Sequence, residues 1–177
     1  MSTIRIVNGD ITQLDVDIIV NAANARLIPG GGVDGAINRV AGPELGAAMM
    51  KIGGCPTGQA VVTPGFGLKA KHVIHTVAPI FGQHTAEDVW QHLFSCYRNV
   101  FALARQLNGA SIALPSLGTG AYGIPITKAS RIAVTSALEH QSLGSDPRDV
   151  VFCCFGDADA RHYGDALDWA RNILPPI

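Results

Sequence analysis

The chain alternates short, nearly continuous apolar segments with longer segments in which apolar residues recur every three or four positions. The short segments are typical of strands buried on both faces of a sheet, and residues 17–20 are the clearest example. The longer ones are typical of amphipathic helices, of which residues 86–107 form the longest, with Gly109 just beyond its end. Strands that alternate with helices predict an α/β fold, a three-layer α/β/α sandwich with a mixed, largely parallel central sheet.

Turn residues between these segments set the expected bounds of each element. Strands are predicted over residues 4–7, 17–20, 59–63, 72–77, 111–114 and 150–154. One helix is predicted to start near residues 33–34 and to run past residue 40. Further helices are predicted over residues 44–51, 86–107, 126–139 and 158–173, the last of them ended by Pro175 and Pro176. With 177 residues and no linker or repeat, residues 1–177 are expected to form a single domain.

Composition excludes several classes of protein. Hydrophobic residues make up 47% of the chain and charged residues 15%, which excludes a disordered chain and a coiled coil. The 13 Lys and Arg against 14 Asp and Glu leave a formal charge of −1, so no global field attracts nucleic acid or an anionic membrane. An anion site would therefore be local and built from backbone N–H groups. The sequence shows neither a signal peptide nor the ~20 apolar residues of a membrane span, so a cytoplasmic protein is expected.

No metal site and no cofactor are expected from the cysteines and histidines. The cysteines form no CxxC motif and are predicted to be mostly buried, free thiols: Cys55, Cys96, Cys153 and Cys154. His72 and His75 are three residues apart on a strand, so their side chains face opposite sides of the sheet. The other histidines are scattered and are predicted on the surface: His84, His92, His140 and His162.

Three strand ends carry the residues with candidate chemistry, and ligands of such sheets bind at the carboxyl ends of the strands. These segments are residues 8–11, residues 21–24 with the glycine run 30–32, and residues 115–125. Two of them are glycine-rich and precede a helix, which lets backbone N–H groups and the helix dipole converge on an anion. Two such loops suit a diphosphate; the alternative is that the glycines only make tight turns. Residues 118–123 also match G-x-G-x-x-G, but a dinucleotide fingerprint belongs in the first βα turn, so that interpretation is rejected.

Several single residues at these strand ends have two interpretations. Asp10 is either a turn or helix cap, or a carboxylate that accepts the exocyclic amine of adenine. Asp34 is either a helix-start cap, or a group beside the anion site that orients a sugar hydroxyl or activates water. Phe155 is either a core residue or an aromatic packed on a base. Ser116 lacks the first glycine of G-x-S-x-G, which disfavours a serine hydrolase.

The three loops together resemble the macrodomain family, and most closely its MacroD-type hydrolase branch. The resemblance extends over essentially the whole chain and rests on residues 9–12 (GDIT), 20–24 (VNAAN), 30–37 (GGGVDGAI), 55–58 (CPTG), 73–77 (VIHTV) and 118–125 (GTGAYGIP), with Arg39 and residues 41–43. This chain departs from the usual sequence of that branch at three positions. It has Asn38 where relatives usually have His, Gly118 where they usually have Ser, and Ala78 where they usually have Gly. Because Gly118 keeps its backbone N–H, phosphate binding is expected to survive.

The resemblance implies a cleft for ADP-ribose at the strand ends. Asn24 would hold the distal ribose and Asp34 would act near its anomeric carbon, which makes these two the implied catalytic residues. The implied substrate-binding residues run from the adenine to the distal ribose and are Asp10, Ile11, Gly31, Gly32, Val33, Ser116, Gly118, Thr119, Gly120, Ala121, Tyr122 and Phe155.

The activity that the resemblance implies is hydrolysis of ADP-ribose esters, on Asp or Glu side chains of proteins and in O-acetyl-ADP-ribose. The implied partners are ADP-ribose and ADP-ribosylated proteins. Two alternatives use the same pocket, a non-catalytic ADP-ribose reader and an ADP-ribose-1″-phosphate phosphatase. Asn24 and Asp34 favour the enzyme, whereas Asn38 favours the reader. A binder of adenylate-rich strands is disfavoured by the neutral charge and by an aromatic content of only 6%.

Overall fold

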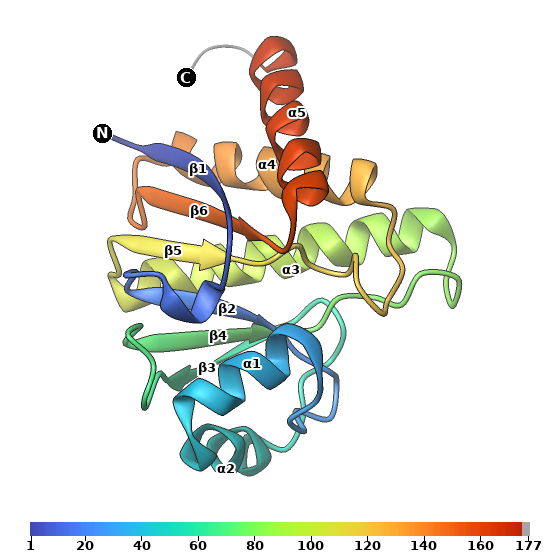
Figure 1. Ribbon diagram of the computed structural model, residues 1–177. Helices are drawn as coiled ribbons and strands as arrows, with labels where there is room; N and C mark the ends of the chain where they lie inside the picture. The colour runs from blue at the N-terminus through green and yellow to red at the C-terminus, as the bar shows by residue number, and fades with distance from the viewer. Residues whose placement is uncertain (175–177) are drawn as a thin grey trace.

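The computed structural model describes residues 1–174, in which a six-stranded sheet lies between two layers of helices (Figure 1). The strands are β1 (Thr3–Asn8), β2 (Ile18–Ala22), β3 (Ala60–Pro64), β4 (His72–Thr76), β5 (Ser111–Leu114) and β6 (Asp149–Cys154). The helices are η1 (Ile11–Gln13, a 3₁₀ turn), α1 (Gly32–Ala41), α2 (Pro43–Ile52), α3 (Ala86–Leu107), α4 (Ile126–Ser142) and α5 (Asp157–Ile173). The prolines expected to end the last helix lie outside the described residues.

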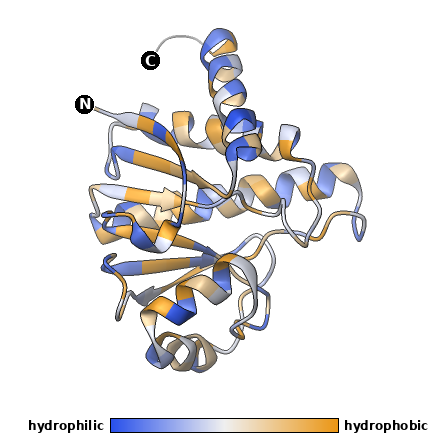
Figure 2. Cartoon of the chain, viewed as in Figure 1, coloured by the Kyte–Doolittle hydropathy of each residue, from blue (hydrophilic) through white to orange (hydrophobic). Residues whose placement is uncertain are grey.

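The sheet has the order β1-β6-β5-β2-β4-β3, and every neighbouring pair is parallel except β3 with β4. Its central strands are buried on both faces. Ile18 and Val20 pack into the cluster formed with α3, α4 and α5, whereas Ile19 packs into the cluster formed with α1 and α2. In Figure 2 the strands are mostly hydrophobic and the helices are two-toned. The predicted three-layer sandwich with a mixed, largely parallel sheet is therefore confirmed.

Strand β2 is longer than the sequence analysis predicts, and the additional residues matter for the cleft described below. The strand was expected over residues 17–20, but it extends through Asn21 and Ala22. Asn21 pairs in register with His75 of β4, and its side chain is fully buried. A polar residue can continue a buried strand when its side chain finds hydrogen-bond partners, and Asn21 finds them (described below).

The cysteine prediction is confirmed and one histidine prediction is wrong. All four cysteines are free and buried. His140 was expected on the surface, but it is only 3% exposed. Its ring stacks on Phe101 at 4.5 Å between ring centroids. Its two nitrogens lie 3.1 Å from Nη1 of Arg105 and 2.9 Å from the carbonyl oxygen of Pro147. Because both ring nitrogens have partners, this histidine can be buried at the end of α4.

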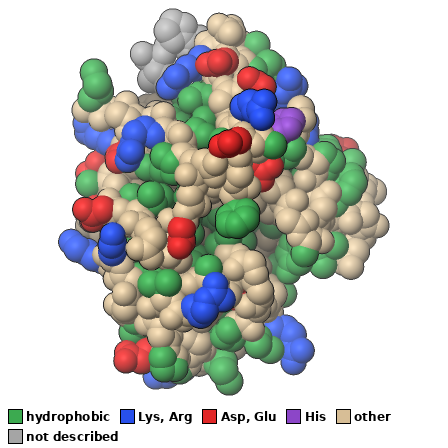
Figure 3. Space-filling model, in the orientation of Figure 1, with side chains coloured by type: hydrophobic (Ala, Val, Ile, Leu, Met, Phe, Trp, Pro, Cys, Tyr) green, Lys and Arg blue, Asp and Glu red, His purple; other side chains and the backbone are tan. Residues whose placement is uncertain are grey.

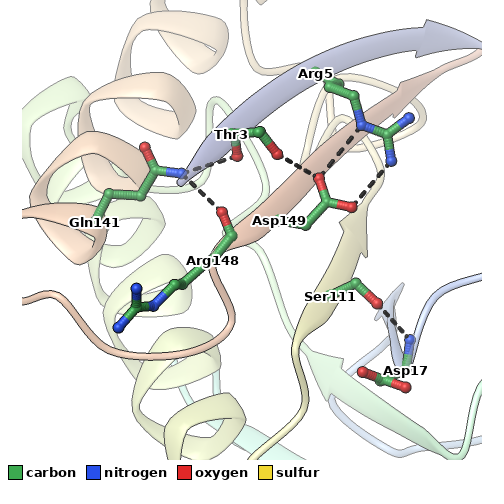
Figure 4. A network of polar contacts seen from close by, with 7 residues as sticks. All are labelled: Thr3, Arg5, Asp17, Ser111, Gln141, Arg148 and Asp149. Carbon is green, nitrogen blue, oxygen red and sulfur yellow. Dashed lines mark hydrogen bonds and ion pairs between the residues drawn. The ribbon is translucent and has the colours of Figure 1, made fainter. Parts of the chain in front are cut away.

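The amino ends of the parallel strands are joined by polar contacts (Figure 4). Asp149 accepts from the Thr3 hydroxyl at 2.6 Å and pairs with Arg5 at 3.1 Å. The Gln141 amide of α4 donates to the carbonyl oxygen of Thr3 at 2.8 Å, and Ser111 accepts from the N–H of Asp17 at 2.9 Å. An exposed ion pair of this kind contributes less than about 1 kcal/mol. These contacts therefore connect neighbouring strands at their amino ends, opposite to the carboxyl ends of the parallel strands.

Within residues 1–174, no helix is long and apolar enough to cross a membrane. The same residues contain no group of three or more His, Cys, Asp or Glu side chains that could hold a metal ion. On the face shown in Figure 3, acidic and basic side chains are interspersed, with no continuous patch of either sign. A ligand that approaches this face would therefore meet local groups rather than one extended field.

Candidate functional site

A cleft with a cavity of about 400 Å³ opens at the carboxyl ends of the parallel strands. Its size is in the range of small-molecule sites. The expected site residues that line it are Asn24, Gly31, Gly32, Val33, Asp34, Ser116, Gly118, Gly120, Ala121 and Tyr122. Four further lining residues were not among the expected site residues, namely Ala22, Ala23, Gly30 and Ala78. The cavity thus lies between the two glycine-rich loops.

One wall of the cleft is the amino end of α1. Gly31 is the residue before the first helical residue, and no side chain caps the helix there. The first N–H groups of a helix have no partner within the helix, and they carry its positive dipole end. Since Gly31, Gly32 and Val33 all line the cavity, this end of α1 faces the space where an anion would bind.

The opposite wall is the loop that follows β5. Gly118 has φ +79°, and a Cβ atom placed there would collide with the Ile124 side chain and lie 3.3 Å from Cβ of Ala78. Ala78, at a position where the resemblance leads one to expect Gly, therefore fills space next to the position where it leads one to expect Ser. The loop closes on itself through the Ile124 N–H, which donates to the carbonyl oxygen of Gly118 at 2.9 Å.

Ser116 lines the cavity without the surroundings of a nucleophile. Its hydroxyl lies 2.7 Å from the Thr119 hydroxyl and accepts from the buried Tyr163 hydroxyl at 3.1 Å. Neither partner is a general base of the kind that activates a serine. Ser116 and Thr119 instead hold the start of the loop, and the Thr119 side chain is turned toward Ser116 rather than lining the cavity.

Asp34 is the most constrained polar group in the cleft, at 5% exposure. Its Oδ1 accepts from Nδ2 of Asn21 at 2.6 Å and from Nδ2 of Asn38 at 3.2 Å, and its Oδ2 accepts from the N–H of Gly30. A carboxylate has about four acceptor positions, two on each oxygen. Three are occupied here, and the remaining one belongs to Oδ2. That oxygen lies on the side of Gly30 and Asn24, within the cavity wall.

Asn24 lines the same part of the cavity and is half-buried. Its amide nitrogen donates to the carbonyl oxygen of Ile28 at 2.7 Å, and its Oδ1 accepts from the N–H of Ile28 at 3.2 Å. The side chain thus closes the turn formed by residues 24–28. A ribose hydroxyl that bonds to Asn24 would share or replace one of these contacts.

Asn21 and His75 lie directly behind Asp34 and were not among the expected site residues. His75 is fully buried on β4, with Nδ1 3.0 Å from Nδ2 of Asn21 and Nε2 2.9 Å from the Thr63 hydroxyl. Burial lowers the pKa of His75 to about 4, so its ring is neutral near pH 7. Both residues could have been recognised as polar interruptions of buried strands, because such side chains are retained only where partners satisfy them.

The buried ring of His75 predicts a loss of stability in mild acid. Between pH 6.5 and about 4 the unfolded chain binds a proton at this residue and the native protein does not. Stability therefore falls as pH falls through this window, by about 2 kcal/mol between pH 7 and pH 5 from this group. Urea unfolding at the two pH values measures the difference, with His75→Gln as the control that removes this group's contribution. An equal unfolding free energy at both pH values would contradict the prediction.

Asp10, Ile11 and Phe155 lie outside the cavity, at the ends of the neighbouring strands β1 and β6. Oδ1 of Asp10 accepts from the N–H and the hydroxyl of Thr12, at 2.9 and 2.7 Å, and so caps η1. The cap leaves Oδ2 of Asp10 without a hydrogen bond among the described residues. Phe155 is 90% exposed, so the interpretation as a core residue is wrong.

Comparison with known proteins identifies close relatives along the whole chain. A Macro domain-containing protein of Ralstonia nicotianae is 51% identical over 169 residues, which cover 96% of each chain. An O-acetyl-ADP-ribose deacetylase of Escherichia fergusonii is 44% identical and covers 94% of this chain and 96% of its own. ADP-ribose glycohydrolase MACROD2 of Xenopus laevis is 47% identical over 90% of this chain, but that match covers 38% of the Xenopus protein.

Solved structures and a family model agree with these relatives. An Oceanobacillus iheyensis macrodomain with ADP has a TM-score of 0.88 and 38% identity, and the match covers 96% of this chain and 92% of that one. A Trypanosoma brucei macrodomain in complex with ADP-ribose has a TM-score of 0.86 and 38% identity, over 93% of this chain and 68% of that one. The family model described as Macro domain matches residues 20–133, which is more than half of the 177 residues. The chain therefore belongs to the macro domain family.

Proposed function

We propose that the protein binds ADP-ribose in this cleft and hydrolyses the ester that joins ADP-ribose to an Asp or Glu side chain or to an acetyl group. The observation that carries the proposal is the single open acceptor position on Oδ2 of Asp34, in the wall of a cavity between two glycine-rich loops. Relatives named as an ADP-ribose glycohydrolase and an O-acetyl-ADP-ribose deacetylase support it.

Binding would rest on backbone N–H groups rather than on cationic side chains. The amino end of α1 and the loop after β5 face the cavity from opposite sides, and neither loop contributes a Lys or Arg to its lining. Both suit the diphosphate. Oδ2 of Asp10 and the exposed ring of Phe155 suit the adenine amine and base at one end. Asn24 and Tyr122 suit the distal ribose at the other end.

Hydrolysis would use Asp34 to hold and polarise one water molecule. The water oxygen bonds to the ester carbonyl carbon or to the anomeric carbon, the adjacent carbon–oxygen bond breaks, and the products are free ADP-ribose and a carboxylic acid. Positioning by a fixed carboxylate and an electrostatic cradle would supply most of the acceleration. Heavy-oxygen water distinguishes the two points of attack, because the label enters the acid in the first case and ADP-ribose in the second.

A non-catalytic reader of ADP-ribose is the second candidate, and one observation favours it. Asn38 stands where the resemblance leads one to expect His, and it uses its amide to donate to Asp34. A side-chain amide cannot act as a general acid or base near neutral pH, whereas an imidazole can. A non-catalytic reader would have the same glycine-rich loops as the hydrolase and the same affinity for ADP-ribose.

Two measurements test the proposal. Calorimetry should show tight 1:1 binding of ADP-ribose and much weaker binding of AMP, NAD and poly(A). Incubation with a protein that carries mono-ADP-ribose on Glu should then release free ADP-ribose. Binding without release would establish the reader, and absence of ADP-ribose binding would contradict both candidates.

A further inference from the structure

We propose that His75 and Asn21 are positioning residues that fix the carboxylate of Asp34 through a buried hydrogen-bond relay. This inference rests on the proposed hydrolysis for its kinetic consequence. The relay begins at Thr63 on the edge strand β3, passes through His75 on β4 and Asn21 on β2, and ends at Asp34 on α1. It thus connects three neighbouring strands to the helix that forms one wall of the cleft.

The relay is isolated from solvent. Asn21 and His75 are fully buried, Thr63 is 2% exposed and Asp34 is 5% exposed. Hydrogen bonds among buried groups are stronger than those at the surface, and losing one partner leaves the other unsatisfied. A buried series of hydrogen bonds therefore holds its side chains in one arrangement.

Donor and acceptor roles follow from the carboxylate. At 2.6 Å from Oδ1 of Asp34, the near atom of the Asn21 amide must be the nitrogen, because two oxygen acceptors would repel one another. That nitrogen has two hydrogens, so its second one is directed at Nδ1 of His75. Nδ1 is then an acceptor, the proton of the ring is on Nε2, and Nε2 donates to the hydroxyl of Thr63.

The remaining atom of the Asn21 amide supports a role beyond packing. Its Oδ1 is buried and has no hydrogen-bond partner among residues 1–174. Leaving a buried acceptor unsatisfied is unfavourable, so it persists only where the rest of the arrangement requires it. The orientation that leaves Oδ1 unsatisfied is the one that directs both N–H bonds at Asp34 and His75.

The relay would determine how the Asp34 carboxylate is oriented in the cleft. Asn21 and Asn38 together occupy both acceptor positions of Oδ1, so the open position is the one on Oδ2. Without His75 as acceptor, the Asn21 amide can rotate and its bond to Oδ1 is lost. The carboxylate of Asp34 can then rotate about its Cβ–Cγ bond, and the water that it holds moves away from the reacting carbon.

Replacing His75 by Asn or by Gln separates the role of Nδ1, which accepts from Asn21, from the role of Nε2, which bonds to Thr63. In His75→Asn the side-chain oxygen takes the place of Nδ1 and keeps the acceptor for Asn21. In His75→Gln the longer amide reaches the place of Nε2 and keeps the bond to Thr63, but not the acceptor. His72→Gln is the matched control, because His72 lies on the same strand and its side chain points to the other face.

The experiment compares kcat, KM and ADP-ribose affinity of the three variants at pH 7.5. We expect His75→Gln to lower kcat by about 10–100-fold with KM and affinity changed by less than about threefold. His75→Asn should regain most of the lost kcat, and His72→Gln should match the unmodified protein. An equal loss of kcat in both His75 variants, at equal thermal stability, would overturn the proposal.

A second measurement is independent of hydrolysis. Nitrogen chemical shifts of the imidazole, recorded by NMR, identify which ring nitrogen carries the proton. We expect the Nε2–H form for His75 throughout pH 6–8, and the Nδ1–H form would overturn the relay. If the protein released no ADP-ribose at all, the proposed function would fail, whereas the tautomer would still decide whether the relay exists.

Discussion

Replacing Asp34 by Ala is expected to lower kcat for release of ADP-ribose from a Glu-modified protein by at least about 100-fold, the usual contribution of a positioned acid or base. The physical reason is the loss of the one open acceptor position on Oδ2. ADP-ribose affinity should change much less, because the N–H groups of the glycine loops are untouched. The measurement pairs single-turnover release with calorimetry on the same preparation.

Two controls make the Asp34 result interpretable. The substitution also removes the partner of Asn21 and Asn38, so thermal unfolding must show that the variant remains folded. Asp168→Asn provides the matched control, because Asp168 is an exposed carboxylate on α5. Full hydrolysis by the Asp34 variant with unchanged affinity would show that Asp34 has no role in the chemistry.

Replacing Gly118 by Val is expected to weaken ADP-ribose binding by at least about 100-fold, equivalent to 2.7 kcal/mol or more. A β-branched side chain is strained at φ +79°, and its Cβ would collide with Ile124 and press against Ala78. The loop must shift to relieve these contacts, and its N–H groups move from the diphosphate. Calorimetry with ADP-ribose measures the loss.

Gly164→Ala is the matched control for this substitution. Gly164 lies within α5, where an added Cβ meets nothing within 4 Å, so alanine should stabilise the helix by about 0.5–1 kcal/mol without changing affinity. The double variant Ala78→Gly with Gly118→Val should recover only part of the affinity, because Ile124 and the backbone strain remain. Undiminished binding by Gly118→Val would remove this loop from the ligand site.

Much of the fold could be predicted from the sequence because its signals are local. Short, mostly apolar segments between turn residues predicted the strands of the sheet, and the spacing of apolar residues predicted α3, which spans Ala86–Leu107. Both patterns arise because each side chain must face a core, and the core is on both sides of this sheet. The end of β2 could not be predicted in this way, since Asn21 is compatible with a strand only through partners distant in sequence.

The candidate site was predictable in its loops and not in its interior. Glycine runs after strands identified both walls of the cleft, because only backbone geometry is involved there. The relay behind Asp34 depends on Thr63 and His75, which follow Asn21 by 42 and 54 positions and meet it only through the order β2-β4-β3. The burial of His140 likewise depended on a partner in α3, Arg105.

The contact between Ala78 and Gly118 has a consequence for selective inhibitors. The cavity wall presents the methyl group of Ala78, from the segment after β4, and the adjacent loop presents bare backbone at Gly118. A compound optimised against a hydroxyl at position 118, the group that the resemblance leads one to expect in relatives, would find no counterpart here. A small apolar substituent at the same point of the compound would instead bury itself against Ala78 and favour this protein over such relatives.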